Sequence, residues 1–441
     1  MKKEFLGLSS YQWLVLFAAW LGWGFDIFDA LLFNFVARLC IPDLLGPGHD
    51  NPQEITFWTG VITSVLLVGM ATGGILFGQL TDRLGRTRTL TFTMLTYALA
   101  TAACALAPNI WVLMIFRFIA SLGIGGEWAA GASLVAESVP EKKRVQAGAL
   151  LYTAAPAGVF LAIFVTDLFT RQLTSIASDT SLSWRLTFLT GLIPAAIAIA
   201  IRWSIKEPET WKAAEHTKAR ISDLFTPAYR RATLGGIAMA AVALISWWSC
   251  NAFLPTIASF LVKDVIPQPP ASEIPALKAW FVTLGTASFN FGGLLGTLLT
   301  VPIANRLGRR PMFLGYFTLG AFFMFAGYQL PMPPEIRLLA TFFQGLTVFG
   351  VFGSFTFYLP ELFPTHLRGT GSGFAYNVAR YLTAGGPFLV GYFASSATNA
   401  AQILDLVSWV ALVPACGAVM VLCGIGVETR GRALPGSDSA R

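Results

Sequence analysis

Five ionisable side chains lie inside long apolar stretches of this 441-residue chain: Asp26, Asp29, Arg117, Glu127 and Arg380. A charged group at the depth of a bilayer is costly, so such residues are retained for internal ion pairs or for the passage of charged molecules. We therefore begin with these five residues and then consider the helices that must position them.

Asp26 and Asp29 are three residues apart, which places both on one face of a helix. Counting about 1.5 Å per residue from the span centres puts them at the level of Arg117. Two neighbouring carboxylates in a low dielectric are not expected to stay ionised together. We predict that Asp26 or Asp29 takes up a proton and that Arg117 modulates its affinity. The alternative is a static Asp–Arg pair that fixes helix packing.

Arg380 and Glu127 fall together on the other side of the midplane by the same count. A buried guanidinium is a bidentate receptor for a carboxylate, and Tyr376 and Asn377 flank Arg380 as further donors. We predict that Arg380 recognises an anion and that Glu127 belongs to the proton-coupling group. The alternative is a permanent Arg380–Glu127 ion pair, which a substrate could displace.

Other polar and aromatic residues within the spans are candidates for a substrate cavity. For any one aromatic residue, packing is the stronger explanation; for the amides, we favour a cavity or contacts between helices over lipid. All three histidines lie in loops, and the five cysteines show no metal or redox spacing. We expect no metal and no cofactor. The added substrate-binding candidates are Trp248, Asn251, Asn290 and Gln344.

The composition requires a membrane. Charged residues are 12% and hydrophobic residues 55% of the chain, and the mean hydropathy is +0.64; a soluble domain carries about 25% charged residues. We predict an all-α integral membrane protein with twelve transmembrane helices in two pseudo-symmetric six-helix bundles. The domains are 1–204, a cytoplasmic linker 205–231, and 232–441. The predicted spans are 11–38, 57–79, 89–107, 109–136, 146–170, 184–204, 232–262, 280–304, 312–329, 336–360, 371–395 and 405–427.

The distribution of Lys and Arg predicts the orientation. With the N-terminus inside, the inner segments hold 21 of the 30 basic residues and the outer segments hold three. Both termini are therefore expected to be cytoplasmic. The net charge of +7 is scattered over short loops, which argues against a nucleic-acid partner.

Two motifs recur at half the length of the chain. Residues 78–88 return at 301–311, and the Glu-x-x-Pro motif with its Arg at 137–144 returns at 361–368. Duplication explains both. We predict that these turns gate the inner face, the alternative being a simple topology turn. Asn305 replaces the Asp of the first copy, which predicts a weaker second latch. The gating candidates are Gly78, Asp82, Arg83, Gly85, Arg86, Glu137, Arg144, Glu361 and Arg368.

Residues 78–88 resemble the loop signature G-x-x-x-D-R-x-G-R-[RK] of the major facilitator superfamily. The resemblance covers essentially the whole chain and implies a central cavity and alternating access. Residues 22–29, 117–128, 361–371 and 376–380 resemble the sialate/lactate and aromatic-acid proton symporter branches. This second resemblance implies proton-coupled uptake of an organic carboxylate. It also implies a monomer surrounded by lipid in the cytoplasmic (inner) membrane. Residues 248–253 depart from the helix 7 pattern of the lactate carriers, so a larger sugar acid or an aromatic acid is equally open.

Three other classes of function remain: a neutral-sugar symporter, a drug exporter, and a non-transport receptor or membrane enzyme. A proton-coupled neutral-sugar symporter fits the Glu-Thr-Arg-Gly motif at 428–431, but does not explain the intramembrane arginines. Residues 154–158 lack the Gly-Pro-rich pattern of drug exporters. An enzyme is not expected, because no phosphate loop, metal cluster or nucleophile constellation is visible.

Overall fold

The computed structural model describes residues 4–5, 8–140, 143–204, 220–364, 367–394 and 400–430. Within these ranges all regular secondary structure is helical except for a hairpin of two two-residue strands, β1 (Glu4–Phe5) and β2 (Leu8–Ser9). Nine helical segments of the described chain are long and apolar enough to cross a membrane by length and composition. The all-α fold class predicted from composition is confirmed.

The first half of the molecule contains six helical rods in the described residues. The fifth rod is continued by a π-helical turn, and the sixth is built from two helices. The elements are α1 (Ser10–Leu45), α2 (Pro52–Leu84), α3 (Arg86–Cys104), α4 (Ile110–Ser138), α5 (Arg144–Tyr152), α6 (Ala154–Asp167), η2 (Leu168–Gln172), α7 (Thr174–Ala177), α8 (Thr180–Leu189) and α9 (Leu192–Ser204).

The second half repeats this arrangement after a short 3-10 turn. Its tenth and twelfth rods are assembled from several helical segments. The elements are η3 (Ile221–Phe225), α11 (Arg230–Phe260), η4 (Leu261–Asp264), α12 (Ile274–Leu307), α13 (Arg309–Gln329), α14 (Pro334–Gln344), η5 (Gly345–Phe349), η6 (Gly350–Ser354), α15 (Phe355–Glu361), α16 (Arg368–Ala394), α17 (Ala400–Ser408), η7 (Trp409–Ala411) and α18 (Leu412–Leu422).

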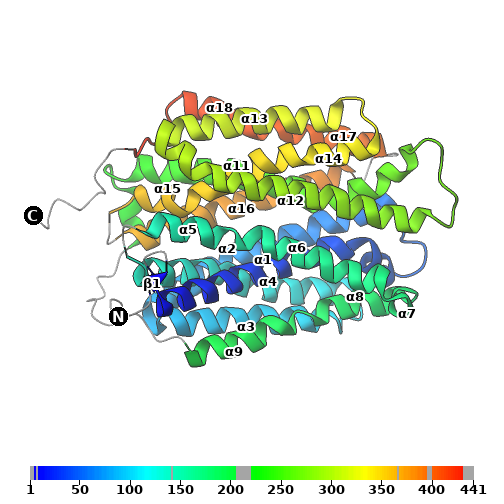
Figure 1. Cartoon of the computed structure of the whole chain (residues 1–441), viewed down its shortest axis with the longest axis horizontal. Helices are drawn as coiled ribbons and strands as arrows, with labels where there is room; N and C mark the ends of the chain where they lie inside the picture. The colour runs from blue at the N-terminus through cyan, green and yellow to red at the C-terminus, as the bar shows by residue number, and fades with distance from the viewer. Residues whose placement is uncertain are drawn as a thin grey trace, which may run out of the picture.

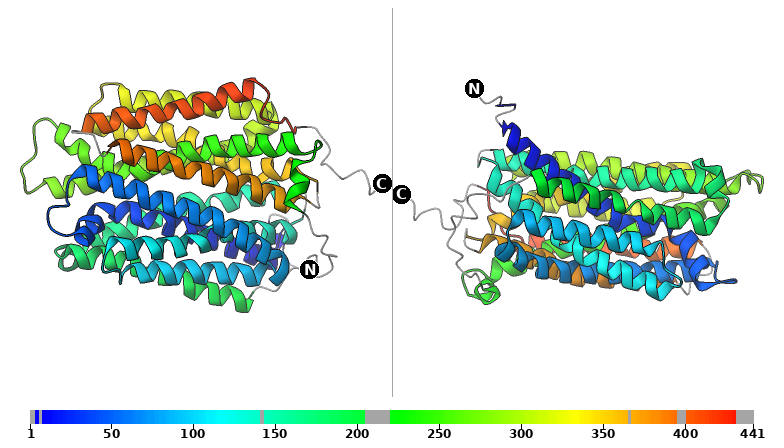
Figure 2. Two further views of the ribbon diagram at one scale, coloured as in Figure 1. Left: turned by 180° about the vertical axis from the view of Figure 1, so that it is seen from behind. Right: turned by 90° about the horizontal axis from the view of Figure 1, so that it is seen from below.

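The rods run side by side along the long axis of the molecule, with the first half below and the second half above in Figure 1. The views from behind and from below show the same parallel arrangement (Figure 2). The hairpin β1–β2 and the chain after α18 lie at the same end of the bundle, which we call the terminal end.

Helices α2 and α16 join the two halves along most of their length. Glycine allows the backbones to meet: a Cβ on Gly60 would lie 2.6 Å from the carbonyl oxygen of Pro387. Ser64 donates a hydrogen bond to the carbonyl of Ala384 at 2.8 Å. Close packing through small residues and a few hydrogen bonds is the usual way in which membrane helices associate.

Local sequence explains where several helices begin. Ser9 and Gln12 form a capping box at the start of α1, and Asn51 and Asn109 cap α2 and α4 through their side chains. Each cap satisfies a backbone N–H that the first helical turn leaves unpaired.

The two repeated turns adopt the same backbone conformation. Gly85 between α2 and α3 has φ 105°, and Gly308 between α12 and α13 has φ 104°. Residues with a side chain rarely adopt a positive φ, so both positions require glycine. The repeat seen in the sequence is therefore also a repeat of structure.

Several predicted spans, including 184–204 and 405–427, are not continuous α-helices, and two of them show why. The span 146–170 is broken at Thr153, between α5 and α6. The span 336–360 changes to π-helical and then 3-10 geometry at Gly345 and Gly350. A Cβ on either glycine would overlap the backbone of α12, at Phe289 and Gly296. Close approach to α12 accounts for the irregular winding of the tenth rod.

Candidate functional site

A small cavity lies between the two halves, at the level of the intramembrane charges. Its volume is about 30 Å³, room for roughly two water molecules. This central cavity is lined from α1, α2, α11, η6 and α16 by Trp23, Asp26, Ile27, Met70, Leu244, Trp247, Trp248, Phe352, Tyr376 and Arg380.

Asp29 points away from this cavity and forms an ion pair with Arg117 inside the first half. Their closest atoms, Oδ1 and Nη1, are 3.0 Å apart, and neither side chain is exposed. Thr101 of α3 donates a hydrogen bond to the same Asp29 oxygen. The Arg117 guanidinium also donates to the carbonyls of Asp29 and Ala30, both at 3.1 Å. The pair ties α1 to α3 and α4.

Asp26 is buried like Asp29 but faces the central cavity, and its Oδ1 has no hydrogen-bond partner. The charged groups that act on it are Glu127, Arg380 and Asp29. Glu127 on α4 is also buried, and its Oε2 has no partner. Both carboxyls therefore have an oxygen free to hold a proton.

Arg380 is the cation of the central cavity. Its Nη1 donates to Asn377 Oδ1 at 3.2 Å, and the guanidinium carbon lies 4.8 Å from the centre of the Tyr376 ring. Its Nε is buried without a partner. No ion pair joins Arg380 to Glu127 or to any other described carboxylate. The alternative of a permanent Arg380–Glu127 pair does not describe this structure.

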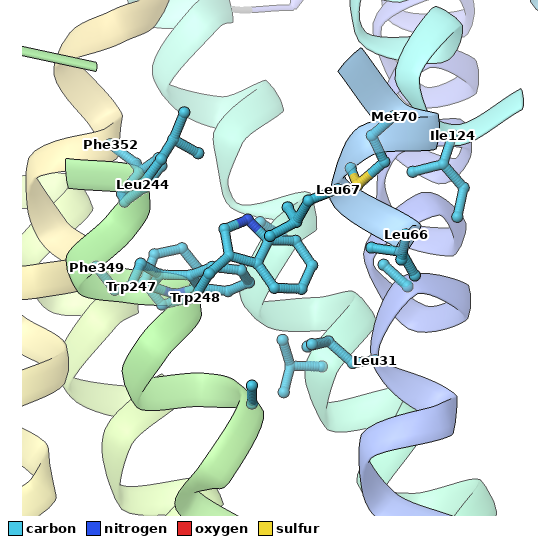
Figure 3. Packing of buried hydrophobic residues seen from close by; sticks show 14 of the residues in the cluster. Leu31, Leu66, Leu67, Met70, Ile124, Leu244, Trp247, Trp248, Phe349 and Phe352 are labelled. Carbon is cyan, nitrogen blue, oxygen red and sulfur yellow. The ribbon is translucent and has the colours of Figure 1, made fainter. Parts of the chain in front are cut away.

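Aromatic rings form most of the remaining wall. Trp247 and Trp248 of α11 meet edge to face, with centroids 4.8 Å apart, and Trp247 also packs on Phe352 at 6.0 Å. Figure 3 shows this pair between Phe349 and Phe352 on one side and side chains of α2, among them Met70, on the other. Trp23 of α1 packs on the ring of Tyr152 at 4.8 Å.

The predicted substrate-binding residues divide into two groups. Arg380, Tyr376 and Trp248 line the central cavity, and Asn377 supports Arg380. The other three amides are not among the lining residues. Asn290 donates to Thr286 of its own helix, Gln344 donates to Phe323 of α13, and the Nδ2 of Asn251 has no partner.

The sequence did not single out Trp23, Ile27, Met70, Leu244 and Phe352 as lining residues. All are apolar or aromatic side chains in spans full of such residues, so no local signal separates them from core residues. Trp23 and Ile27 belong to the same helix 1 motif as Asp26. This shared motif was the signal that could have identified them as lining residues.

The turn of the second half is held by a group of charged residues. Arg309 donates to both oxygens of Glu361, at 2.6 and 3.0 Å. Glu428 accepts from the backbone N–H groups of Arg309 and Arg310, both at 3.0 Å, at the N-terminus of α13. Thr429 donates to Glu361 at 2.5 Å. A carboxylate at a helix N-terminus is stabilised by the dipole and the free N–H groups. These contacts hold the second turn together although Asn305 replaces the Asp of the first copy.

Of the gating candidates, Gly85 and Glu361 are described in full. The remaining side chains lie outside the described part of the structure, so their proposed contacts stay predictions. These are Gly78, Asp82, Arg83, Arg86, Glu137, Arg144 and Arg368.

The chain belongs to the Major Facilitator Superfamily, whose family model matches residues 13–265. Its members are transporters, so the resemblance read from the repeated turns is confirmed, and the protein is a multi-pass membrane transporter rather than an enzyme.

Two curated relatives align over most of the chain. A putative metabolite transport protein of Haemophilus influenzae is 31% identical and covers 87% of this chain and 89% of its own. A probable 4-methylmuconolactone transporter of Cupriavidus pinatubonensis is 30% identical and covers 98% and 96%. Relatives 25–26% identical include a gentisate transporter, a cis,cis-muconate transport protein and a sialic acid transporter.

Among solved structures, a D-xylose–proton symporter superposes with a TM-score of 0.75 over 96% of this chain and all of its own. Its sequence identity is 19%. The likeness establishes the twelve-helix fold and carries no information on substrate.

Proposed function

We propose that the protein is a secondary active transporter that takes up an organic carboxylate together with a proton by alternating access. The observation that carries this proposal is Arg380. Its guanidinium lines the central cavity between the halves and has no carboxylate partner among the described side chains. A buried cation without a counter-charge is costly, and an incoming carboxylate would supply that charge.

Charge balance supports proton coupling. The five intramembrane charges comprise three carboxyls and two guanidiniums, and one carboxyl, that of Asp29, is paired with Arg117. If Asp26 and Glu127 were both ionised beside Arg380, the site would carry one excess negative charge. One proton neutralises it. A substrate carboxylate adds a further negative charge to the dry site, so a second proton must enter with each monocarboxylate.

The surroundings of the two aspartates favour Asp26 over Asp29 as the residue that takes up the proton. Asp29 is engaged through Oδ1 by Arg117 and Thr101, whereas Asp26 forms no ion pair with a described side chain and lines the cavity. We propose that Asp26, with Glu127, carries the coupled proton, and that Asp29 and Arg117 hold α1 in place beside it.

The names of the relatives favour an acid as substrate. Muconate, gentisate and sialic acid are all carboxylic acids, and they are named for relatives that cover at least 84% of this chain. The neutral-sugar alternative has only the likeness in fold to the xylose symporter, which argues for neither substrate.

The topology completes the proposal. A relative named as an inner membrane metabolite transport protein supports a location in the cytoplasmic membrane, and the excess of Lys and Arg in the predicted inner loops supports cytoplasmic termini. We further propose that 1–204 and 232–441 move as the two units of a monomer joined by the linker 205–231, with the repeated turns gating the terminal end.

The test uses purified protein in liposomes with an imposed pH gradient. Asp26→Asn should abolish proton-driven accumulation of a carboxylate such as benzoate while exchange of internal for external substrate continues. Asp167→Asn is the matched control, because Asp167 pairs with Arg171 at the far end of α6. Accumulation by Asp26→Asn at the wild-type level would refute coupling through this residue.

A further inference from the structure

We propose that the substrate is a planar aromatic or conjugated acid, and that the indole N–H of Trp247 is a second anchor for a hydrogen-bond acceptor on its ring. This inference rests on the proposed function, since it takes Arg380 as the site of the carboxylate. It assigns to Trp247 a role in specificity.

The composition of the cavity wall selects for a flat ligand. Five of the ten lining residues carry aromatic rings, and three more are Ile27, Met70 and Leu244. Aromatic faces and edges pack on a flat ring in stacked or edge-to-face geometry, and a thioether such as that of Met70 packs favourably against rings.

The same wall excludes polyhydroxylated ligands. None of the ten lining residues is an Asn, Gln, Ser or Thr; the amides that sequence pointed to lie elsewhere. A sugar or sugar acid would find only Asp26, Arg380, Tyr376 and the indole N–H groups as partners in this wall, too few for all of its hydroxyl groups. Each buried hydroxyl left unpaired would cost about tenfold in affinity.

The size of the cavity points in the same direction. At about 30 Å³, it must widen to admit any carboxylic acid larger than a few atoms. A planar ring needs the smallest separation of the two halves, because it can enter between the walls with its thin dimension across the gap. A chair-shaped ring needs a wider one.

Trp247 supplies the second, independent observation. The residue lines the cavity and is 4% exposed, and its Nε1 is buried with no hydrogen-bond partner. Native proteins pair nearly all buried polar atoms, so an orphan donor at a site calls for an explanation. An acceptor on the substrate, such as a hydroxyl, carbonyl or second carboxylate oxygen, would satisfy it.

The two anchors come from different helices of the cavity wall. Arg380 lies on α16, whereas Trp247 lies on α11 within the rings of Trp248, Phe349 and Phe352. A ring that reaches from Arg380 to Trp247 would carry the carboxylate at one edge and the acceptor at another.

The experiment measures binding by titration calorimetry on the purified full-length protein. The probes are benzoate, 3- and 4-hydroxybenzoate, cyclohexanecarboxylate, glucuronate and xylose. We expect benzoate to bind about tenfold more tightly than cyclohexanecarboxylate or glucuronate, and at least one hydroxybenzoate to bind about fivefold more tightly than benzoate. Xylose should not bind.

Trp247→Phe keeps a ring at the site but removes the donor. It should abolish the preference for the hydroxybenzoate, measured as the ratio of hydroxybenzoate to benzoate affinity within the same variant. Trp58→Phe, outside the lining, is the matched control and should change neither. A hydroxybenzoate preference that survives in Trp247→Phe overturns the role of Trp247, whose orphan N–H would then be paired with water only.

The two proposals fail in different ways. If glucuronate or cyclohexanecarboxylate binds as tightly as benzoate, the planar-substrate inference is wrong while acid transport stands. If no acid binds and xylose does, the proposed function itself is wrong.

Discussion

The carboxylate of Asp29 lies 3.0 Å from the guanidinium of Arg117, and both side chains are fully buried. Asp26, one helical turn earlier, is equally buried but forms no ion pair with a described side chain and lines the central cavity. Two identical side chains on one helix therefore meet different environments. One ties helices of the first half together, and the other faces the cavity.

Asp29→Asn should destabilise the protein strongly, because it leaves the Arg117 guanidinium buried without a counter-charge. We expect the free energy of unfolding to fall by about 3–5 kcal/mol, measured by thermal unfolding in detergent. Asp167→Asn removes one partner of the half-exposed Arg171 pair and should cost less than about 1 kcal/mol. Equal stability of the two variants would contradict a structural role for the Asp29–Arg117 pair.

Gly22→Ala should displace the Glu127 side chain. A Cβ at this position would lie 2.4 Å from Glu127 Oε1, and such overpacking costs about 1–3 kcal/mol. Proton-driven uptake should fall with it. Gly131→Ala places a methyl 3.5 Å from the same oxygen, an ordinary contact, and should behave as wild type in uptake and in thermal unfolding. Identical behaviour of the two variants would show that Glu127 has room to move.

Gly60→Ala should separate the halves where α2 and α16 meet. The new Cβ would lie 2.6 Å from the carbonyl of Pro387, so the contact must open. We expect faster labelling of a cysteine placed at Ser64, which bonds to Ala384 in the closed contact. Gly385→Ala, with nothing within 4 Å of its Cβ, is the control. Unchanged labelling in Gly60→Ala would mean that the interface yields elsewhere.

The Glu428 carboxyl should make stability depend on pH. Burial raises the pKa of Glu428, but hydrogen bonds from the backbone N–H groups of Arg309, Arg310 and Arg430 lower it by more, so the net pKa lies below its ordinary value of 4.5. A depressed pKa contributes stability that is complete above pH 4.5 and is lost as the pH falls through the folded-state pKa.

Thermal unfolding between pH 3 and 7 checks this prediction. Glu428→Gln should lower stability by about 1 kcal/mol at neutral pH and lose less than wild type on acidification. Glu273→Gln is the control, because Glu273 is an exposed carboxyl at the start of α12, and the turn lies at the other end of that helix. Parallel pH profiles for wild type and Glu428→Gln would show that the capping carboxylate does not contribute.

The fold was predictable because hydropathy, loop charge and the repeated turns are properties of long segments. The site was predictable only in part. Asp26 and Asp29 are about 60° apart around α1, and this angle spans the border between the interior of the first half and the cavity. Spacing places both on one face but cannot say which residue crosses that border.

The amides show a second limit. Residues such as Asn290 and Gln344 can satisfy their donors on helix carbonyls, so a polar side chain in a membrane span need not face a cavity. The aromatic wall was missed for the opposite reason, since Trp23 and Phe352 look like packing residues until the two halves are brought together.

The Asp29–Arg117 pair joins α1 and α4, so both of its charges belong to one half of the molecule. Asp26 and Arg380 come from α1 and α16, one from each half. Any rocking of one half against the other leaves the first separation constant and alters the second. In the alternating-access cycle proposed above, such a displacement would do electrical work on charges from opposite halves, and the gap between Asp26 and Arg380 would be a natural coordinate for that cycle.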